Sequence, residues 1–201
     1  MTIRRAMGAL VLLAAPLTVL AQSNQLDLYY IDAHVEARTP GFGRFKENGD
    51  GYGVKGVFTV AEGVFLAGEY QKSTYDDTDN ELEWIRGGIG FAFASDPMMS
   101  WFGLAEAIRL NADNASGSDS ESGYGLHVGA RFDFSRVFSL GARVGYVDLD
   151  ESNGVEWLVD AAFALSPGLS LFADYRLSSL EDDANNEIDL DDLRLGLRLL
   201  F

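Results

Sequence analysis

Residues 192–201 read Asp-Leu-Arg-Leu-Gly-Leu-Arg-Leu-Leu-Phe, a run in which apolar and polar side chains alternate along the chain. One face of an extended segment with this period of two carries Leu193, Leu195, Leu197, Leu199 and Phe201. The other face carries Asp192, Arg194, Gly196 and Arg198. Because successive side chains of a β-strand point to opposite faces, the run predicts a strand with one apolar and one charged face.

The same alternation recurs in nine earlier segments, each about ten residues long and bounded by turn-forming residues. The ten predicted strands are 27–37, 51–60, 64–72, 85–93, 99–110, 124–133, 138–146, 156–165, 169–177 and 192–201. The fifth segment is ambiguous, because Phe102, Leu104 and Ile108 share a face with Glu106. The pattern therefore predicts an all-β chain of about ten strands, with eight as the alternative if the fifth segment is misread.

The connections between these segments alternate in length. Short turns at 61–63, 94–98, 134–137 and 166–168 follow the even-numbered strands, and longer polar loops at 39–50, 73–81, 111–122, 148–154 and 178–187 follow the odd-numbered ones. A closed antiparallel up-and-down barrel would collect all the short turns at one end and all the long loops at the other. The long loops carry most of the acidic excess: Glu47, Asp50, Asp76, Asp77, Asp79, Glu81, Asp113, Asp119, Glu121, Asp148, Asp150, Glu151, Glu181, Asp182, Asp183 and Glu187, against Arg44 and Lys46.

The aromatic residues indicate that the apolar face of this barrel is its outside. Tyr52, Tyr70, Tyr124, Tyr146, Trp157 and Tyr175 lie at strand ends next to the long loops, whereas Phe91, Phe93, Phe132, Phe138, Phe163 and Phe201 lie toward the short turns. Two aromatic bands one strand length apart are typical of the two interfaces of a membrane. We therefore expect a transmembrane β-barrel with short periplasmic turns and long extracellular loops; a lipocalin-like soluble barrel is the alternative.

The first 21 residues have the features of a secretory signal peptide. Arg4 and Arg5 precede an apolar run over residues 6–20, and Val19-Leu20-Ala21 supplies small or medium residues for cleavage after Ala21. We expect residues 1–21 to be removed and residues 22–201 to form one barrel domain in the outer membrane of a Gram-negative bacterium.

Composition narrows the possible partners and cofactors. The formal net charge of −16 argues against nucleic acid, and the absence of cysteine excludes disulfides and thiolate metal sites. No cofactor, metal or catalytic residue is predicted. The acidic loops offer oxygen ligands but do not match the spacing of a calcium-binding EF-hand, so a solvated surface is the expected role.

The signal peptide, the alternating strands and the C-terminal Leu-Arg-Leu-Gly-Leu-Arg-Leu-Leu-Phe run resemble small bacterial outer-membrane β-barrels of the OmpA/OmpX-like superfamily. Gly51-Tyr52-Gly53-Val54-Lys55-Gly56 and Gly88-Ile89-Gly90-Phe91 are similar to strands of that superfamily. The resemblance implies escort by periplasmic chaperones and insertion by the barrel-assembly machinery, which would read Leu197, Leu199 and Phe201. Many members have eight strands, which departs from the ten predicted here.

The charged face of the strands is expected to fill the barrel lumen. Its cations are Arg38, Lys55, Arg86, Arg131, Arg143, Arg176, Arg194 and Arg198, and its anions are Glu36, Glu69, Glu106, Asp133, Glu156, Asp160, Asp174 and Asp192. In the first strand this assignment turns Tyr29, Ile31, Ala33, Val35 and Ala37 to the lipid, and Asp32, His34, Glu36 and Arg38 to the lumen. Balanced charge in a narrow barrel predicts paired groups and a closed or gated lumen.

These features predict a monomeric, non-enzymatic barrel with a structural or surface-interaction role, in contact with lipid and lipopolysaccharide. A narrow diffusion channel for small solutes is the alternative. The two histidines, His34 and His127, are both expected on the lumen face, where ordinary polar contacts explain them better than catalysis does.

Overall fold

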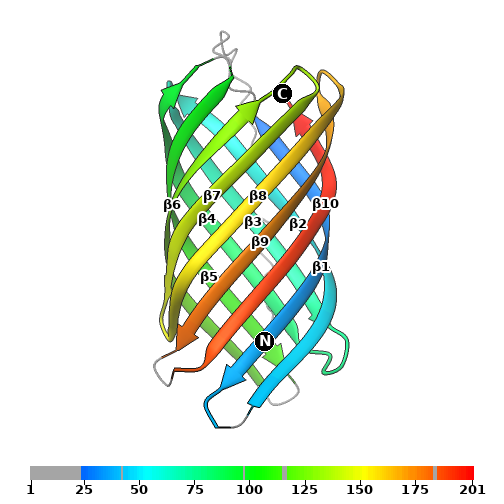
Figure 1. Cartoon of the computed structure of the whole chain (residues 1–201), viewed down its shortest axis with the longest axis vertical. Helices are drawn as coiled ribbons and strands as arrows, with labels where there is room; N and C mark the ends of the chain where they lie inside the picture. The colour runs from blue at the N-terminus through cyan, green and yellow to red at the C-terminus, as the bar shows by residue number, and fades with distance from the viewer. Residues whose placement is uncertain (1–23, 42, 97, 115–116, 183–184) are drawn as a thin grey trace, which may run out of the picture.

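The computed structural model describes residues 24–41, 43–96, 98–114, 117–182 and 185–201, and the predicted signal peptide lies outside these ranges. Ten strands follow one another along the chain (Figure 1). They are β1 (Gln25–Thr39), β2 (Gly43–Ala61), β3 (Val64–Tyr75), β4 (Glu81–Ser95), β5 (Met99–Asn114), β6 (Gly117–Asp133), β7 (Phe138–Leu149), β8 (Ser152–Ser166), β9 (Leu169–Asp182) and β10 (Glu187–Leu200). Among the described residues, no helix is long and apolar enough to cross a membrane.

Every strand pairs antiparallel with its neighbours in the chain, and β1 also pairs with β10, so the sheet closes into a barrel. The closing register runs from Gln25 opposite Leu200 to Arg38 opposite Glu187. Closure leaves no strand edge unpaired, which matters in hydrocarbon because an unsatisfied backbone group there costs several kcal/mol. The prediction of a closed, ten-stranded antiparallel barrel is confirmed.

The two ends of the barrel differ in their connections. We call the end that carries Gln25 and Leu200 the terminal end, and the opposite end, where β1 turns into β2, the acidic end. At the acidic end the strands continue through most of the segments predicted as long loops; for example, only residues 40–42 separate β1 from β2. The polar side chains there do not interrupt the backbone ladder, because antiparallel pairing needs only backbone groups.

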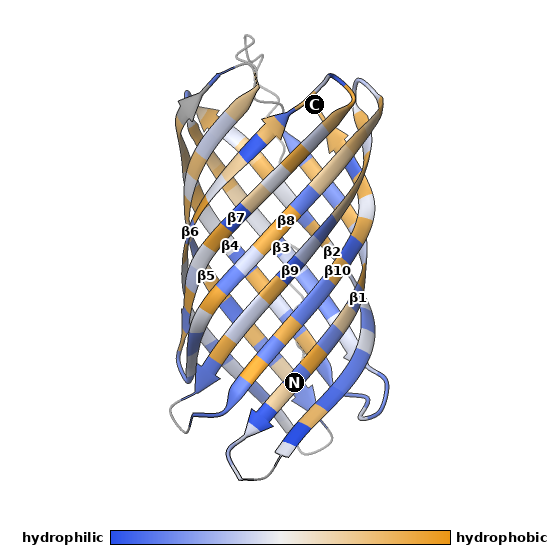
Figure 2. Cartoon of the chain, in the orientation of Figure 1, coloured by the Kyte–Doolittle hydropathy of each residue, from blue (hydrophilic) through white to orange (hydrophobic). Residues whose placement is uncertain are grey.

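The outward face is apolar across the middle of the barrel. Leu28, Ile89, Leu126, Val159 and Leu195 are all about half exposed, as expected of side chains that contact lipid. Orange apolar residues alternate with blue polar ones along each strand over this zone, and blue residues dominate at the acidic end (Figure 2).

A band of tyrosines marks where this apolar zone ends toward the acidic end. Their hydroxyls donate hydrogen bonds to polar groups on the adjacent strand, from Tyr70 to Glu83 (2.9 Å), Tyr124 to Asp148 (2.8 Å), Tyr146 to Asn153 (2.7 Å) and Tyr175 to Asp191 (2.6 Å). Each bond joins an aromatic ring at lipid depth to a group in water, which is how tyrosine is used at membrane interfaces.

Beyond this tyrosine band the polarity of the two faces reverses. The interior holds an apolar cluster, which we call the apolar layer: Trp84, Ile108, Val147, Leu149, Leu180 and Leu190, with Leu82, Leu110 and Ile188 packed against it. The exterior there carries charged residues such as Asp32, Lys46 and Arg109. Water surrounds this part of the barrel, so burial of apolar side chains inside it is favourable, as in a soluble protein.

The predicted facing of β1 is wrong. Asp27, Tyr29, Ile31 and Ala33 point into the barrel and are buried, whereas Leu28, Tyr30, Asp32 and His34 point outward. The register explains the correction, because Ile31 pairs with Arg194 of β10, and paired residues share a face. The prediction relied on the apolar residues 31–37, which lie where the inside of the barrel is apolar.

The structure also settles the ambiguous fifth strand. Phe102, Leu104, Glu106 and Ile108 all face the lumen, and Trp101 and Arg109 face outward. Three apolar residues share the inner face with Glu106, because the surroundings of this strand change along the barrel. Phe102 packs against Phe65 near the terminal end, Glu106 binds Arg86 in the middle, and Ile108 belongs to the apolar layer.

Replacement of Tyr175 by Phe tests the tyrosine band. The change removes the hydrogen bond to Asp191, and we expect it to lower the free energy of unfolding by about 1 kcal/mol. Tyr52→Phe is the matched control, because Tyr52 makes no side-chain hydrogen bond within the described part of the chain. Urea unfolding of protein folded into lipid vesicles measures both; equal losses for the two variants would contradict the assignment.

Candidate functional site in the barrel lumen

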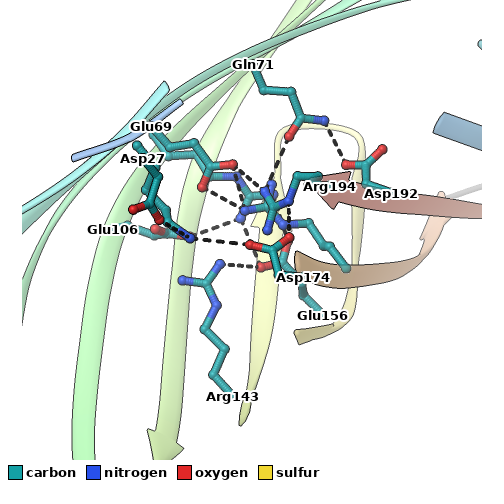
Figure 3. Close-up of polar contacts among 12 residues, drawn as sticks. Asp27, Glu69, Gln71, Glu106, Arg143, Glu156, Asp174, Asp192 and Arg194 are labelled. Carbon is teal, nitrogen blue, oxygen red and sulfur yellow. Dashed lines mark hydrogen bonds and ion pairs between the residues drawn. The ribbon is translucent and has the colours of Figure 1, made fainter. Parts of the chain in front are cut away.

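A layer of paired charges crosses the middle of the lumen, and Arg194 lies among its carboxylates (Figure 3). The guanidiniums of Arg194 and Arg176 are both fully buried. Both bind Glu69 at 2.7 Å, and Arg194 also binds Asp174 of the neighbouring strand β9. Tyr29 donates a hydrogen bond of 2.9 Å to the same Glu69. Glu69 on β3 is thus tied to β1, β9 and β10, none of which pairs with β3 in the sheet.

A second group of ion pairs surrounds Glu156 of β8, which is fully buried. Arg86 of β4 binds Glu156 through two nitrogens, at 3.0 and 2.7 Å, and Arg143 of β7 binds it at 3.0 Å. Arg86 also binds Glu106 at 3.1 Å, and His127 contacts that carboxylate at 3.0 Å. The side chain of Arg86 therefore bridges the lumen between β4 and β8.

A third group lies toward the terminal end. Arg198 forms a two-nitrogen contact with Asp27, at 3.0 and 3.1 Å, and lies 3.5 Å from Asp160. Lys55 lies between Asp27 and Asp174, at 3.5 and 3.4 Å. We call the three groups together the charged layer.

Aromatic rings support several of these cations. The Arg86 guanidinium lies 4.5 Å from the ring centre of Trp84, and the Arg194 guanidinium lies 5.2 Å from that of Tyr29. Arg198 lies 4.9 Å from the ring centre of Phe172. Cation–π contacts of desolvated guanidiniums offset part of the cost of burying charge.

The structure distributes the sixteen predicted lumen charges over three places. Twelve lie in the centre of the lumen: the charged layer contains Lys55, Glu69, Arg86, Glu106, Arg143, Glu156, Asp160, Asp174, Arg176, Arg194 and Arg198, and Asp192 beside it accepts a hydrogen bond from Gln71. Arg131 and Asp133 form a partly exposed pair, with 3.1 Å between them, at the terminal end. Glu36 and Arg38 are not in the lumen, and for these two the prediction is wrong for the reason given for β1.

Glu36 and Arg38 belong instead to an external cluster at the acidic end. Glu36 binds Arg38 (2.7 Å), Arg44 (2.8 Å) and Lys46 (2.6 Å) across the β1–β2 hairpin. The hydrogen bonds from Lys46 and Arg38 lower the pKa of Glu36 from its usual 4.5 to about 2. The cluster therefore stays charged at neutral pH and holds the two strands of the hairpin together near its turn.

Sequence reasoning missed Asp27, Tyr29 and Gln71 as members of the layer. Asp27 and Tyr29 share the inner face of β1, which was assigned to lipid; the register with β10 is the signal that places them correctly. Gln71 donates a hydrogen bond of 2.7 Å to Asp192, and its place two residues after Glu69 on one strand face is a sequence signal that was available.

One group among the described residues has ligand atoms close enough to hold a metal ion. It is formed by Glu106, His127 and Glu156, whose ligand atoms lie within 4.8 Å of one another. The Arg86 guanidinium donates to both carboxylates, so the position between them already carries a positive charge. The arrangement is better suited to a protein cation than to an added metal.

The lumen thus has three zones along its axis. The apolar layer fills the acidic end, the charged layer crosses the middle, and a cavity of about 690 Å³ lies on the terminal side of the charged layer. We call this cavity the vestibule. Two successive layers of buried side chains separate it from the acidic end.

Comparison with known proteins agrees with this architecture. The model of the outer membrane protein beta-barrel domain family matches residues 7–160, and the chain belongs to this family of the outer membrane. Comparison with curated proteins yields no match.

Similar solved structures are also outer membrane barrels. An outer membrane channel from Pseudomonas putida F1 has a TM-score of 0.58 at 11% identity, covering 92% of this chain and 97% of that chain. The outer membrane protease OmpT from Escherichia coli has a TM-score of 0.50 at 9% identity, covering 92% and 99%. Neisserial surface protein A has a TM-score of 0.46 at 16% identity, covering 88% and 97%. These likenesses concern the fold alone.

Replacement of Glu156 by Gln tests the charged layer. The change keeps the shape but leaves Arg86 and Arg143 without their shared negative charge, and we expect a loss of about 3–5 kcal/mol in the free energy of unfolding. Asp133→Asn, which removes the charge of the exposed Arg131 pair, should cost at most about 1 kcal/mol. Unfolding in urea, followed by tryptophan fluorescence in lipid vesicles, compares them; a similar small loss for both would contradict a buried network.

Proposed function

We propose that this protein is a non-enzymatic outer-membrane barrel with a closed lumen, and that its working surface is the acidic end exposed to the cell exterior. The observation that carries the proposal is the pair of stacked seals inside the barrel, the charged layer and the apolar layer. A solute crossing the lumen would have to separate buried ion pairs and then displace packed apolar side chains, and both are costly.

The chemistry of the lumen supports a structural role over catalysis. The carboxylates of the charged layer are engaged by arginine, lysine or glutamine, and His127 contacts a carboxylate that Arg86 also binds. His34 is an exposed side chain with its Nδ1 atom 3.9 Å from Asp32, which is longer than a hydrogen bond. The other ring nitrogen of His127, Nδ1, is buried and has no hydrogen-bond partner among the described residues, so it is closed to a substrate in the lumen.

The acidic end offers a surface for interaction. Exposed carboxylates lie at or next to the tips of four hairpins, among them Asp77, Asp113, Asp150 and Glu181. A rigid sheet that extends past the membrane holds these charges at fixed positions, and a rigid display lowers the entropy cost of binding a cationic partner.

The remaining contacts of the protein follow from this role. Lipid surrounds the wall, lipopolysaccharide surrounds the acidic end, and the barrel acts as a monomer. Export would remove residues 1–21, and chaperones and the barrel-assembly machinery would recognise Leu197, Leu199 and Phe201, which lie exposed on the outer face at the chain end.

Conductance in a planar bilayer tests the proposal. We expect no discrete openings from the inserted protein, because the two seals block the lumen. Heat-modifiable migration on a gel checks that the barrel is folded before the recording. Discrete openings whose size changes in Arg143→Gln would contradict the proposal and make the protein a narrow diffusion channel.

A further inference from the structure

The vestibule is a cavity with two chemically different walls. Its apolar wall is formed by side chains of β2, β3 and β5: Val57, Phe65, Ala67, Phe102 and Leu104. The opposite wall is formed by β7, β8 and β10, which contribute the charged side chains of Arg143, Asp160 and Arg198. Charged residues of the other strands also line the cavity: Lys55, Glu69, Arg86, Glu106, Arg131 and Asp133. Its volume of about 690 Å³ lies within the range of small-molecule sites.

Glycines make the apolar wall smooth. The Phe65 ring lies against Gly90, where an added Cβ would come within 2.0 Å of the ring, and the Phe102 ring lies against Gly129, where the distance would be 2.4 Å. The two rings contact each other edge to face, with 6.0 Å between their centres. Because both rings lie against the barrel wall, they line the cavity without filling it.

Arg143 carries the least compensated positive charge at the floor of the vestibule. Its ion pair is with Glu156, a carboxylate that Arg86 and Arg176 also contact, at 2.7 and 3.8 Å. Arg86 and Arg176 each have a second carboxylate, Glu106 and Glu69 respectively. Arg143 makes this ion pair through Nη2, and its side chain is 12% exposed; its Nε atom is buried and has no hydrogen-bond acceptor among the described residues.

The carboxylates of the vestibule are better satisfied. Glu69 is bound by two arginines and Glu106 by Arg86 and His127, whereas Asp160 has Arg198 at 3.5 Å. At the floor of the vestibule an incoming anion would therefore meet the partly exposed guanidinium of Arg143, whose one carboxylate is shared with two further arginines, whereas a cation approaching Glu69 or Glu106 would have to displace an existing partner.

We propose that the vestibule binds a small amphiphile with one anionic head group and a short apolar tail, entering from the terminal end. The head group accepts hydrogen bonds from Arg143, and the tail packs against Phe65, Phe102 and Leu104. The site lies on the side of the charged layer away from the acidic end, so a ligand can bind there without crossing the charged layer or the apolar layer.

Isothermal titration of the protein in lipid nanodiscs tests this site, with empty nanodiscs subtracted. Octanoate is the anionic probe, and octylammonium has the same tail with a cationic head. We expect octanoate to bind and octylammonium to bind at least about tenfold more weakly, because its head would meet Arg143. Equal heats with empty nanodiscs, or a preference for octylammonium, would overturn the proposal.

Three variants locate the binding. Arg143→Gln should weaken octanoate by about tenfold or more, and Ala67→Phe should abolish binding because the ring fills the cavity. Arg109→Gln is the matched control, since Arg109 is exposed on the outside at the acidic end. Should Arg143→Gln fail to fold on the gel-shift assay, Ala67→Phe decides the question, since it leaves every ion pair intact. Octanoate binding that survives Ala67→Phe would overturn the proposal whatever the conductance of the barrel.

Discussion

An unpaired backbone group or an unpaired charge is costly in hydrocarbon. This barrel avoids both costs, because its sheet is closed and its charged side chains point into the lumen. Closure of β1 on β10 pairs the backbone, and the lumen side chains pair with one another across the barrel. Arg194 of β10 illustrates the dependence, because it contacts Asp174 of the adjacent strand β9 and also Glu69 of β3, a strand with which β10 does not pair. The charged layer therefore fills the middle of the lumen and also connects strands that do not pair with one another.

The surroundings of the barrel change along its axis, and the two faces change with them. Lipid surrounds the middle, where the outside is apolar and the inside charged. Water surrounds the acidic end, where Trp84 and Leu180 lie inside and Asp32 and Lys46 lie outside. The tyrosine band lies at the boundary. The same sheet thus behaves as a membrane barrel over one part of its length and as a small soluble domain over the other.

This reversal explains what the sequence could and could not predict. The inner residues of β2, β9 and β10 were predicted correctly, because their alternation is dominated by the lipid-facing part, as in Leu193–Leu199. In β1 the clearest alternation, from Ile31 to Ala37, runs from the level of Arg194 into the apolar layer, which Val35 contacts, so apolar residues that face inward were read as facing lipid. A period of two gives the faces of a strand but not which face meets lipid. The order of the layers in the lumen could not be predicted from the sequence, because it depends on how far each strand extends and on contacts between strands that are remote in sequence.

Accessibility of single cysteines along β1 tests this account most directly, and the natural absence of cysteine leaves each label unique. Spin labels at Leu28→Cys, Asp32→Cys and Ile31→Cys would be exposed to oxygen, which concentrates in lipid, and to a polar nickel complex, which stays in water. If the polarity of the two faces reverses at the tyrosine band, the label at 28 responds to oxygen, the label at 32 on the same face responds to nickel, and the label at 31 is protected from both. A label at 31 that responds to oxygen would place Ile31 in lipid and contradict the reversal.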